Sequence, residues 1–407
     1  MRIGRTLPPA AAPISLLNLL SGGKAAFMGE KAVELFREDL KDYFGVDHCF
    51  LVSSGKAALV LILEALKVIH PERGEVLVPA LNCFSVPSAI TRSGLKVVLC
   101  DIDRDSLDFD YDQLVAKLEN PRLLCVIPTH LFGRPADISR LRSMIDDPDV
   151  TIIEDAAQAF GGEVAGEKSG TLGDVSLFSL GRGKALSTVE GGIVMTNRVD
   201  LATQIEEIYR KLPGYSLLQR LKLGIYALAM ACLLHPLLYW LPNSLTFLKL
   251  GQTIYDPSFS LQRLSPLQAG FARGWQRKIE NFKAIRKSHV EYWSIFLDGI
   301  KQVHYGRAFG EWSGLIRFPW MVESSTQRLR LLQESKRLGL GVAGTYPASI
   351  ARIPSLKRNF QTESFPVAEE CARFLVTLPV HPFVRSRDKA RIKQSILRLC
   401  DGSEVGI

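Results

Sequence analysis

Short runs of apolar residues recur through the first half of the chain, and they constrain its fold more than any other feature. Segments with helical spacing of apolar residues, such as 30–44 and 56–66, separate these runs. Strands that are apolar at every position are typical of a parallel sheet covered by helices on both faces. The sequence therefore predicts an α/β domain with a mostly parallel sheet. The expected strands are 49–52, 75–78, 97–100, 123–127 and 151–153.

Polar residues lie just beyond the ends of these apolar runs. Ser54 and Gly55, His130, Asp155 and Ser179 all occupy such positions. Ligands bind beyond the carboxyl ends of the strands in open parallel sheets. We therefore expect a binding site along this edge.

One lysine near this edge has unusual neighbours. Lys184 lies in a short, glycine-flanked loop, five residues after Ser179. A lysine in a crowded, partly dry setting has a lowered pKa and can form a Schiff base, and Asp155 can hold a pyridinium nitrogen. Together they favour pyridoxal phosphate. Taken alone, the lysine would more often be a solvated surface residue and the acid a helix cap.

The turn Ser53-Ser-Gly55 precedes a helix and offers a place for the phosphate of that cofactor. Free backbone N–H groups and the helix dipole favour an anion at a helix N-terminus. Many turns look like this, so the signal is weak by itself, and Ser179 alone would be a plain turn hydroxyl. Cys83 and Phe84 offer a face for ring stacking, although an aromatic residue is usually core.

The 407 residues are enough for two domains. From about residue 271 the pattern changes to a long polar helix, 276–296, followed by mixed short strands and helices. We expect a large cofactor-binding α/β domain at 1–270 and a small C-terminal α+β domain at 271–407. An apolar insertion at about 217–250 interrupts the large domain.

Residues 223–248 contain no Asp, Glu, Lys or Arg, and on length alone they could cross a bilayer. A single crossing would separate the segments before and after it, so it is excluded if both belong to one catalytic unit. A helical hairpin broken at His235-Pro236 remains. We expect it either to be buried at a subunit interface or to dip into a membrane face, with Tyr239 and Trp240 at the boundary.

The charge and the cysteines narrow the class of protein further. The net charge of +8 is spread along the chain, which favours anionic small molecules as ligands over nucleic acid. Solvated surface lysines would account for most of this charge. The sequence contains no zinc-finger or RNA-binding pattern. The seven cysteines are never spaced as C-x-x-C, so we expect free thiols and no metal site. The expected location is the cytoplasm, with peripheral membrane contact as the open alternative.

Several segments in a fixed order carry a resemblance over nearly the whole chain. They are 53–59, 78–79, 98–103, 127–137, 153–161, 170–174, 178–196, 263–269, 345–347 and 378–382. Their order and spacing resemble the nucleotide-sugar aminotransferases of the DegT/StrS type. The resemblance implies the fold-type-I arrangement of pyridoxal-phosphate enzymes, with a seven-stranded sheet, and a homodimer with the site at the subunit boundary.

Carried over to this sequence, the resemblance implies a role for each site residue. Lys184 would form the Schiff base with pyridoxal phosphate, Asp155 would hold the pyridine nitrogen, and Gln158 would contact the region of the phenolic oxygen. The phosphate would be held by Ser179, Ser54, Gly55 and the backbone amide of Lys56.

Three positions depart from the family pattern. Lys56 stands where threonine or serine is usual, so its ammonium group would take part in phosphate binding. The ring-stacking aromatic maps onto Cys83, with Phe84 one place along, and the sequence leaves open which of them faces the ring. Leu261 stands where an asparagine usually reaches the partner subunit's phosphate. The candidates to replace it are Ser260, Gln262 and Arg263.

The resemblance implies transfer of an amino group from an amino acid, with L-glutamate as the expected donor, to a nucleotide-linked keto sugar for amino-sugar and polysaccharide biosynthesis. Relatives with histidine in place of Lys184 act as dehydratases, so the lysine favours transamination. A dehydratase or other lyase stays an alternative, as does a regulator or membrane-associated assembly protein without activity. The apolar insertion and Leu261 give the last some weight, whereas the intact residues Lys184 and Asp155 oppose it.

Overall fold

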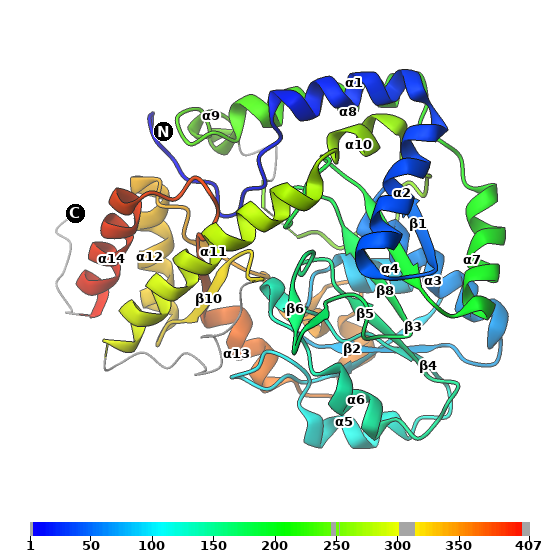
Figure 1. Ribbon diagram of the computed structural model, residues 1–407. Helices are drawn as coiled ribbons and strands as arrows, with labels where there is room; N and C mark the ends of the chain where they lie inside the picture. The colour runs from blue at the N-terminus through cyan, green and yellow to red at the C-terminus, as the bar shows by residue number, and fades with distance from the viewer. Residues whose placement is uncertain (1–2, 246–249, 252, 301–313, 401–407) are drawn as a thin grey trace.

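A seven-stranded sheet in the order β1-β9-β8-β5-β4-β2-β3 forms the centre of the larger part of the molecule (Figure 1). The computed structural model describes residues 3–245, 250–251, 253–300 and 314–400. The strands are β1 His48–Val52, β2 Glu75–Pro79, β3 Lys96–Cys100, β4 Leu123–Val126, β5 Thr151–Asp155, β8 Val175–Ser179 and β9 Gly192–Thr196.

The pairing is parallel throughout except at β9, which is antiparallel to both β1 and β8. A parallel pair needs a crossover connection, usually a helix, whereas residues 180–191 join β8 to β9 without one. The expected mostly parallel sheet is therefore confirmed, with one reversed strand that the connection explains.

Successive side chains of each strand point to opposite faces of the sheet. On β1, Phe50 and Val52 pack with α3, α4 and α7, whereas Cys49 and Leu51 pack with α2. Helices α5 and α6 cover that second face beside β2, β4 and β5. The helices are α2 Glu30–Phe44, α3 Gly55–Ile69, α4 Ser85–Arg92, α5 Tyr111–Leu118, α6 Ile138–Met144, α7 Val199–Lys211 and α10 Pro266–Phe271.

A second, antiparallel sheet in the order β10-β12-β11 forms the smaller part, to which the long helix α11, Trp275–Asp298, leads (Figure 1). Its elements are β10 Phe318–Met321, α12 Ser325–Leu338, β11 Ala343–Gly344, α13 Pro366–Phe374, β12 Leu375–Leu378 and α14 Ser386–Cys400. The structure also contains a short hairpin, formed by β6 Glu163–Val164 and β7 Glu167–Lys168. Its 3-10 turns include η1 Leu131–Gly133, η4 Ile350–Arg352 and η5 Lys357–Phe360.

The start of the chain lies against this smaller part. Arg5 Nη2 is 2.6 Å from Asp388 Oδ2, and the Leu7 amide donates to the Gly339 carbonyl over 3.0 Å. The division into domains at about residue 270 stays a proposal, in which the first residues cross to the C-terminal side.

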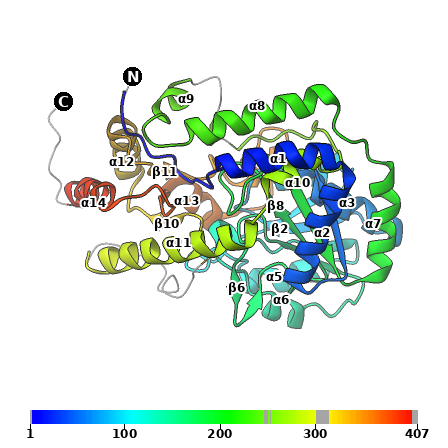
Figure 2. The same cartoon turned by 45° about the horizontal axis from the view of Figure 1, so that its top comes forward.

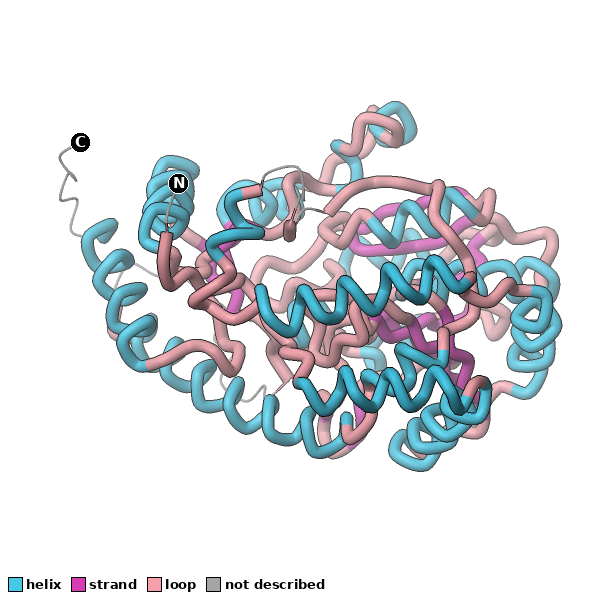
Figure 3. Tube along the Cα trace, turned by 90° about the horizontal axis from the view of Figure 1, so that it is seen from above, coloured by secondary structure: helices cyan, strands magenta, loops and turns pink. Residues whose placement is uncertain are grey.

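The apolar insertion forms α8, Leu217–Leu233, and α9, Trp240–Ser244, on either side of a turn. The turn contains His235 and Pro236, as expected, and residues 246–249 of the insertion lie outside the described residues. Helix α8 runs beside α1, Leu16–Met28, as Figures 1 and 2 show, and Figure 3 looks down on this layer. Within the described ranges, none of the helices is both long enough and apolar enough to span a bilayer.

Candidate active site

The start of α3 and the end of β8 form a subsite suited to a phosphate. Ser54 caps α3 by accepting a 3.1 Å hydrogen bond from the Ala57 amide. A methyl group added to Gly55 would lie 3.0 Å from Cβ of Ser179, so the two positions are adjacent. In the part of the chain that the structure describes, the amides of Gly55 and Lys56 have no acceptor, and a helix N-terminus with free amides favours an anion.

The backbone of this subsite has room only for glycine at one point. A methyl group added to Gly192, the first residue of β9, would lie 2.1 Å from the carbonyl oxygen of Ser54. This contact sets β9 directly against the turn before α3. Gly192 is therefore needed for close packing at this point.

Lys184 lies recessed but not fully buried in the loop between β8 and β9. The loop is closed by hydrogen bonds from the Leu180 amide to the Gly191 carbonyl, 2.8 Å, and from the Thr188 amide to the Leu180 carbonyl, 3.0 Å. Burial lowers the pKa of Lys184, Arg317 lowers it further, and Cys83 and Asp155 oppose the shift. A lysine in this setting is suited to act as a nucleophilic amine.

Asp155 ends β5 with only 5% of its surface exposed. Its Oδ1 accepts a 3.1 Å hydrogen bond from the Ala157 amide. Burial raises the pKa of Asp155, whereas Lys184 lowers it. The Ala157 amide, His130 and Thr129 also lower it, but burial outweighs them. A further cation beside this carboxylate would therefore be favourable, and a protonated pyridine nitrogen would supply one.

His130, expected at the strand edge, lies fully buried behind Asp155. Its Nδ1 accepts from the Ala136 amide over 2.9 Å, so Nε2 carries the proton that is donated to Glu154 Oε1 over 2.6 Å. Its backbone amide donates to the Asp155 carbonyl over 3.0 Å. His130 therefore positions the end of β5.

Cys83 lies near Lys184, whereas Phe84 packs in the core. The Cys83 thiol is near enough to affect the pKa of both Lys184 and Tyr346. Phe84 is 7% exposed and belongs to the main core cluster. Cys83 is thus the residue of the pair that borders the lysine.

The ammonium group of Lys56 lies over an aromatic ring. Its Nζ lies 4.2 Å from the centre of the Phe259 ring. Burial lowers the pKa of Lys56, and Asp256 opposes the shift. A cation over an aromatic face is held there electrostatically. A role of the ammonium group in phosphate binding stays a prediction.

The described contacts of Arg263 do not include Lys184 of the same chain. Its backbone forms an antiparallel bridge with Val52, and the Arg263 charge counteracts the burial that raises the pKa of Tyr209 on α7. No described interaction joins it to Lys184 or Asp155, and its Nε is buried without a partner among the described residues. Gln262 donates to the Gly214 carbonyl over 3.2 Å. Of these two candidates for the contact with the partner subunit's phosphate, Arg263 therefore has the side chain with fewer hydrogen bonds in its own chain.

The structure adds three residues that the sequence patterns did not single out. Gln158 Nε2 donates to the Tyr346 hydroxyl over 3.3 Å. Arg286 is 4% exposed and donates from Nη2 to the Ala185 carbonyl over 3.2 Å. Arg317 Nη2 lies 3.7 Å from where a methyl group on Gly183 would be. Tyr346 lies inside the quoted motif 345–347, but no local pattern marks either arginine.

Arg317 has no acidic neighbour in the described structure. Burial lowers its pKa, and the groups that oppose the shift are the hydroxyls of Tyr346 and Tyr239. No hydrogen bond or ion pair of Arg317 is present among the described residues. Among the described residues, Lys184, Arg286 and Arg317 therefore bring more basic groups to the site than the one carboxylate of Asp155.

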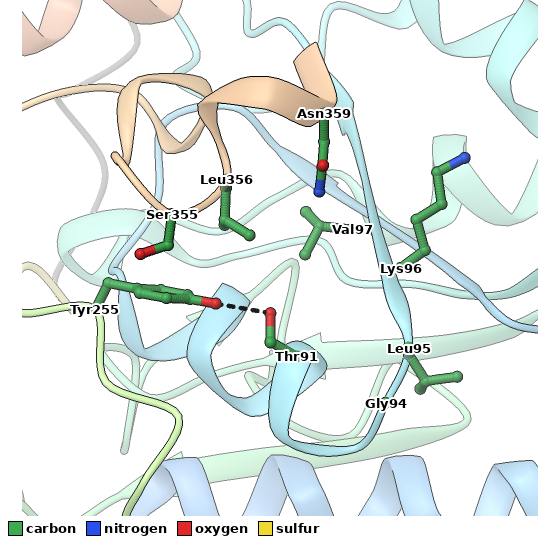
Figure 4. Close-up of a pocket in the computed structure, with 9 residues that line it drawn as sticks. All are labelled: Thr91, Gly94, Leu95, Lys96, Val97, Tyr255, Ser355, Leu356 and Asn359. Atoms are coloured by element: carbon green, nitrogen blue, oxygen red, sulfur yellow. Dashed lines mark hydrogen bonds between the residues drawn. The ribbon is translucent and has the colours of Figure 1, made fainter.

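A separate pocket of about 390 Å³ lies between the end of α4, β3 and η5 (Figure 4). The Tyr255 hydroxyl donates to Thr91 Oγ1 over 3.0 Å at its edge. It shares no residue with the site around Lys184. No cluster of potential metal ligands occurs within the described ranges.

The model of the DegT/DnrJ/EryC1/StrS aminotransferase family matches residues 15–220. L-Glutamine:2-deoxy-scyllo-inosose aminotransferase of Streptoalloteichus tenebrarius is 35% identical over 206 residues, 49% of this chain and 48% of that protein. The chain thus spans about half the length of this relative. UDP-2-acetamido-2-deoxy-3-oxo-D-glucuronate aminotransferase of Pseudomonas aeruginosa is 26% identical over 90% of this chain and 89% of its own length.

Solved structures share the whole fold at low sequence identity. DesI in the presence of its TDP-sugar product has a TM-score of 0.77 and 21% identity over 98% of this chain and 94% of that chain. Helicobacter pylori PseC, an aminotransferase of pseudoaminic acid biosynthesis, has a TM-score of 0.76 and 16% identity over 99% and 100%. The fold expected from the sequence is therefore confirmed.

Proposed function

The chain belongs to the DegT/DnrJ/EryC1/StrS aminotransferase family, and from this we propose that it is a pyridoxal-phosphate-dependent aminotransferase acting on a nucleotide-linked keto sugar. The observation that carries the proposal is the placement of Lys184. Its recessed amine lies within electrostatic reach of the buried carboxylate of Asp155. Ser179, five residues before it, adjoins the N-terminus of α3.

The residues present fit pyridoxal phosphate. Ser179 with the amides of Gly55 and Lys56 would hold the phosphate, and Asp155 would hold the pyridine nitrogen. Cys83 would border the ring and Gln158 its oxygen substituent. When bound, the cofactor supplies a carbonyl for amine exchange and a ring that accepts electrons.

The residues of the chain divide the remaining work. Lys184, released as a free amine when the donor binds, takes the proton from the donor's α-carbon, and its lowered pKa suits this role. Arg317, which has no acidic partner among the described residues, would hold the carboxylate of the donor. We expect L-glutamate as the donor, and L-glutamine, named for one relative, is the competing candidate.

The partner subunit and the cellular location belong to the same proposal. We propose a homodimer in which Arg263 reaches the cofactor of the partner subunit, because no described contact joins Arg263 to Lys184 or Asp155 in its own chain. A cytoplasmic location agrees with the free thiols of the described cysteines. A contact of residues 223–248 with a membrane surface is part of the proposal and rests on the exposed apolar side chains of its described residues, such as Ile225 and Leu237.

The Lys184→Ala variant tests the proposal. Wild-type protein with added cofactor is expected to show the absorbance band of the lysine-bound cofactor and to convert the cofactor to its amine form with glutamate. Lys184→Ala should lose both, whereas Lys168→Ala, at a lysine on β7, should keep both. Water release from the sugar without amine transfer would instead identify a dehydratase.

A further inference from the structure

Helix α1 exposes large apolar side chains along one stripe. Leu17, Leu20 and Phe27 are 75%, 57% and 95% exposed. Their spacing of three and seven residues places them on one side of the helix. The opposite side of α1 is committed to packing, since Asn18, Gly22 and Ala25 are buried.

Helix α8 repeats the pattern beside it. Leu218, Leu221, Ile225 and Leu228 follow one another at intervals of three and four residues and are between 56% and 61% exposed. The packed side carries the buried Leu223 and Ala227. A surface helix ordinarily presents polar residues to solvent, so a helix that is apolar on both sides indicates a second contact.

The two stripes lie in one layer of the molecule. Helices α1 and α8 run side by side in Figures 1 and 2, and both pack through the cluster that includes Ile14, Leu223 and Phe271. The turn after α8 and helix α9 extend the layer with Leu237 and Leu241, which are 55% and 41% exposed. We call α1, α8 and the turn to α9 the apolar layer.

The charges of the apolar layer have one sign. Residues 3–29 and 212–245 contain no aspartate or glutamate, and the nearest acid along the chain after α1 is Glu30, which begins α2. Lys24 on α1 and Lys222 on α8 are exposed, and Arg220 is partly exposed. An anionic surface would therefore meet basic, apolar and uncharged polar side chains on these segments, but no carboxylate side chain.

We propose that the apolar layer binds the surface of an anionic phospholipid bilayer, with α1 and α8 lying in the plane of the interface. Leucine and phenylalanine side chains would enter the boundary of the acyl chains, and the basic residues would meet the headgroups. A second copy of the chain fits less well, because a contact of the layer with itself offers no carboxylate to its lysines. This inference rests on the membrane contact proposed above, to which it adds α1, the basic residues and the class of lipid, and it does not depend on transamination.

Flotation of the full chain with vesicles tests the inference. Vesicles of phosphatidylcholine alone are compared with vesicles that also contain phosphatidylglycerol, at low and at high salt. The expected result is binding to the anionic vesicles that weakens as salt screens the charges. Failure of the wild-type chain to float with anionic vesicles at low salt would overturn the proposal.

Two double variants separate the apolar and the electrostatic contributions. Leu221→Glu with Ile225→Glu should weaken vesicle binding by about tenfold or more. Lys24→Glu with Lys222→Glu should weaken it by about twentyfold on anionic vesicles, since each basic residue near such a surface contributes about fivefold. The matched control is Leu329→Glu on α12, which is 57% exposed like Ile225.

The controls decide between the occupants of the layer. Thermal unfolding and cofactor absorbance confirm that each variant folds, and these two readouts are independent of lipid. Equal loss of vesicle binding in Leu329→Glu would overturn the proposal. If the variant at positions 221 and 225 became monomeric while vesicle binding did not change, the layer would belong to a second copy instead.

Discussion

The buried carboxyl group of Asp155 affects both the stability of the fold and the binding of a cofactor. Because burial raises its pKa, the carboxyl group stabilises the fold below the unfolded pKa, and this contribution is lost as the pH rises through the folded value. At neutral pH the charged group is therefore unfavourable until a cation lies beside it. A bound pyridinium would reverse that effect, which couples cofactor binding to stability.

Replacing the carboxylate should separate these two effects. We expect Asp155→Asn to raise the thermal midpoint of the cofactor-free protein at neutral pH, and to weaken cofactor binding by about ten- to hundredfold because a charged hydrogen bond is lost. Thermal scans with and without cofactor measure both. A lower midpoint in both states would show that Asp155 is needed for the fold itself.

Arg317 leads to a second prediction at this scale. Arg317→Gln should raise KM for the amino donor by about ten- to hundredfold and leave KM for the keto sugar nearly unchanged, since a charged hydrogen bond to the donor carboxylate is lost. Because Arg317 lowers the pKa of Lys184, the variant should also shift the lower limb of the pH–rate profile to higher pH. Arg317→Lys should recover the position of that limb but not the donor affinity. A rise in KM for the sugar alone would contradict the assignment.

The N-terminus of α3 has a structural and a binding role that can be measured separately. Ser54 and Ser324 cap helices of 15 and 14 residues, and each accepts a hydrogen bond of 3.1 Å from the amide three positions on. Only the first cap adjoins Ser179. The second therefore serves as a matched reference for loss of a cap without loss of a ligand.

Both Ser54→Ala and Ser324→Ala should reduce the free energy of unfolding by about 1 kcal/mol. Ser54→Ala alone should also weaken cofactor binding, because the turn that aims the amides of α3 is loosened. Urea unfolding and a cofactor titration measure the two effects. Equal cofactor affinity in the two variants would remove Ser54 from the phosphate subsite.

At the scale of the whole molecule, the proposal to test is that two chains assemble into a dimer with shared sites. If Arg263 serves the partner subunit, a dimer of one Lys184→Ala chain and one Arg263→Ala chain contains one complete site. Mixing the two inactive variants after unfolding and refolding should then recover about a quarter of wild-type activity, because about half of the dimers formed at random are mixed. No recovery would place Arg263 in the site of its own chain or outside any site.

The local patterns of the sequence were sufficient for the large domain. The apolar runs gave β1 to β5 to within two residues, and the helical spacing gave α2 and α11, because strands and helices covered by other elements need apolar residues at fixed intervals. The turn at His235-Pro236 was also predicted, since proline cannot continue a helix there. The lysine loop stood out for its glycines and small polar residues.

The sequence by itself thus determined the mostly parallel sheet and the family, and it singled out Lys184 as the candidate reactive lysine. Only the tertiary structure decided which groups surround that lysine. Arg317 and Arg286 lie more than a hundred residues after Lys184, and their approach depends on how the second sheet and α11 pack against the first. The structure alone also showed that α8 packs on one side and leaves an equally apolar side exposed. Periodicity reports which residues avoid water, whereas packing decides which of them another part of the chain covers.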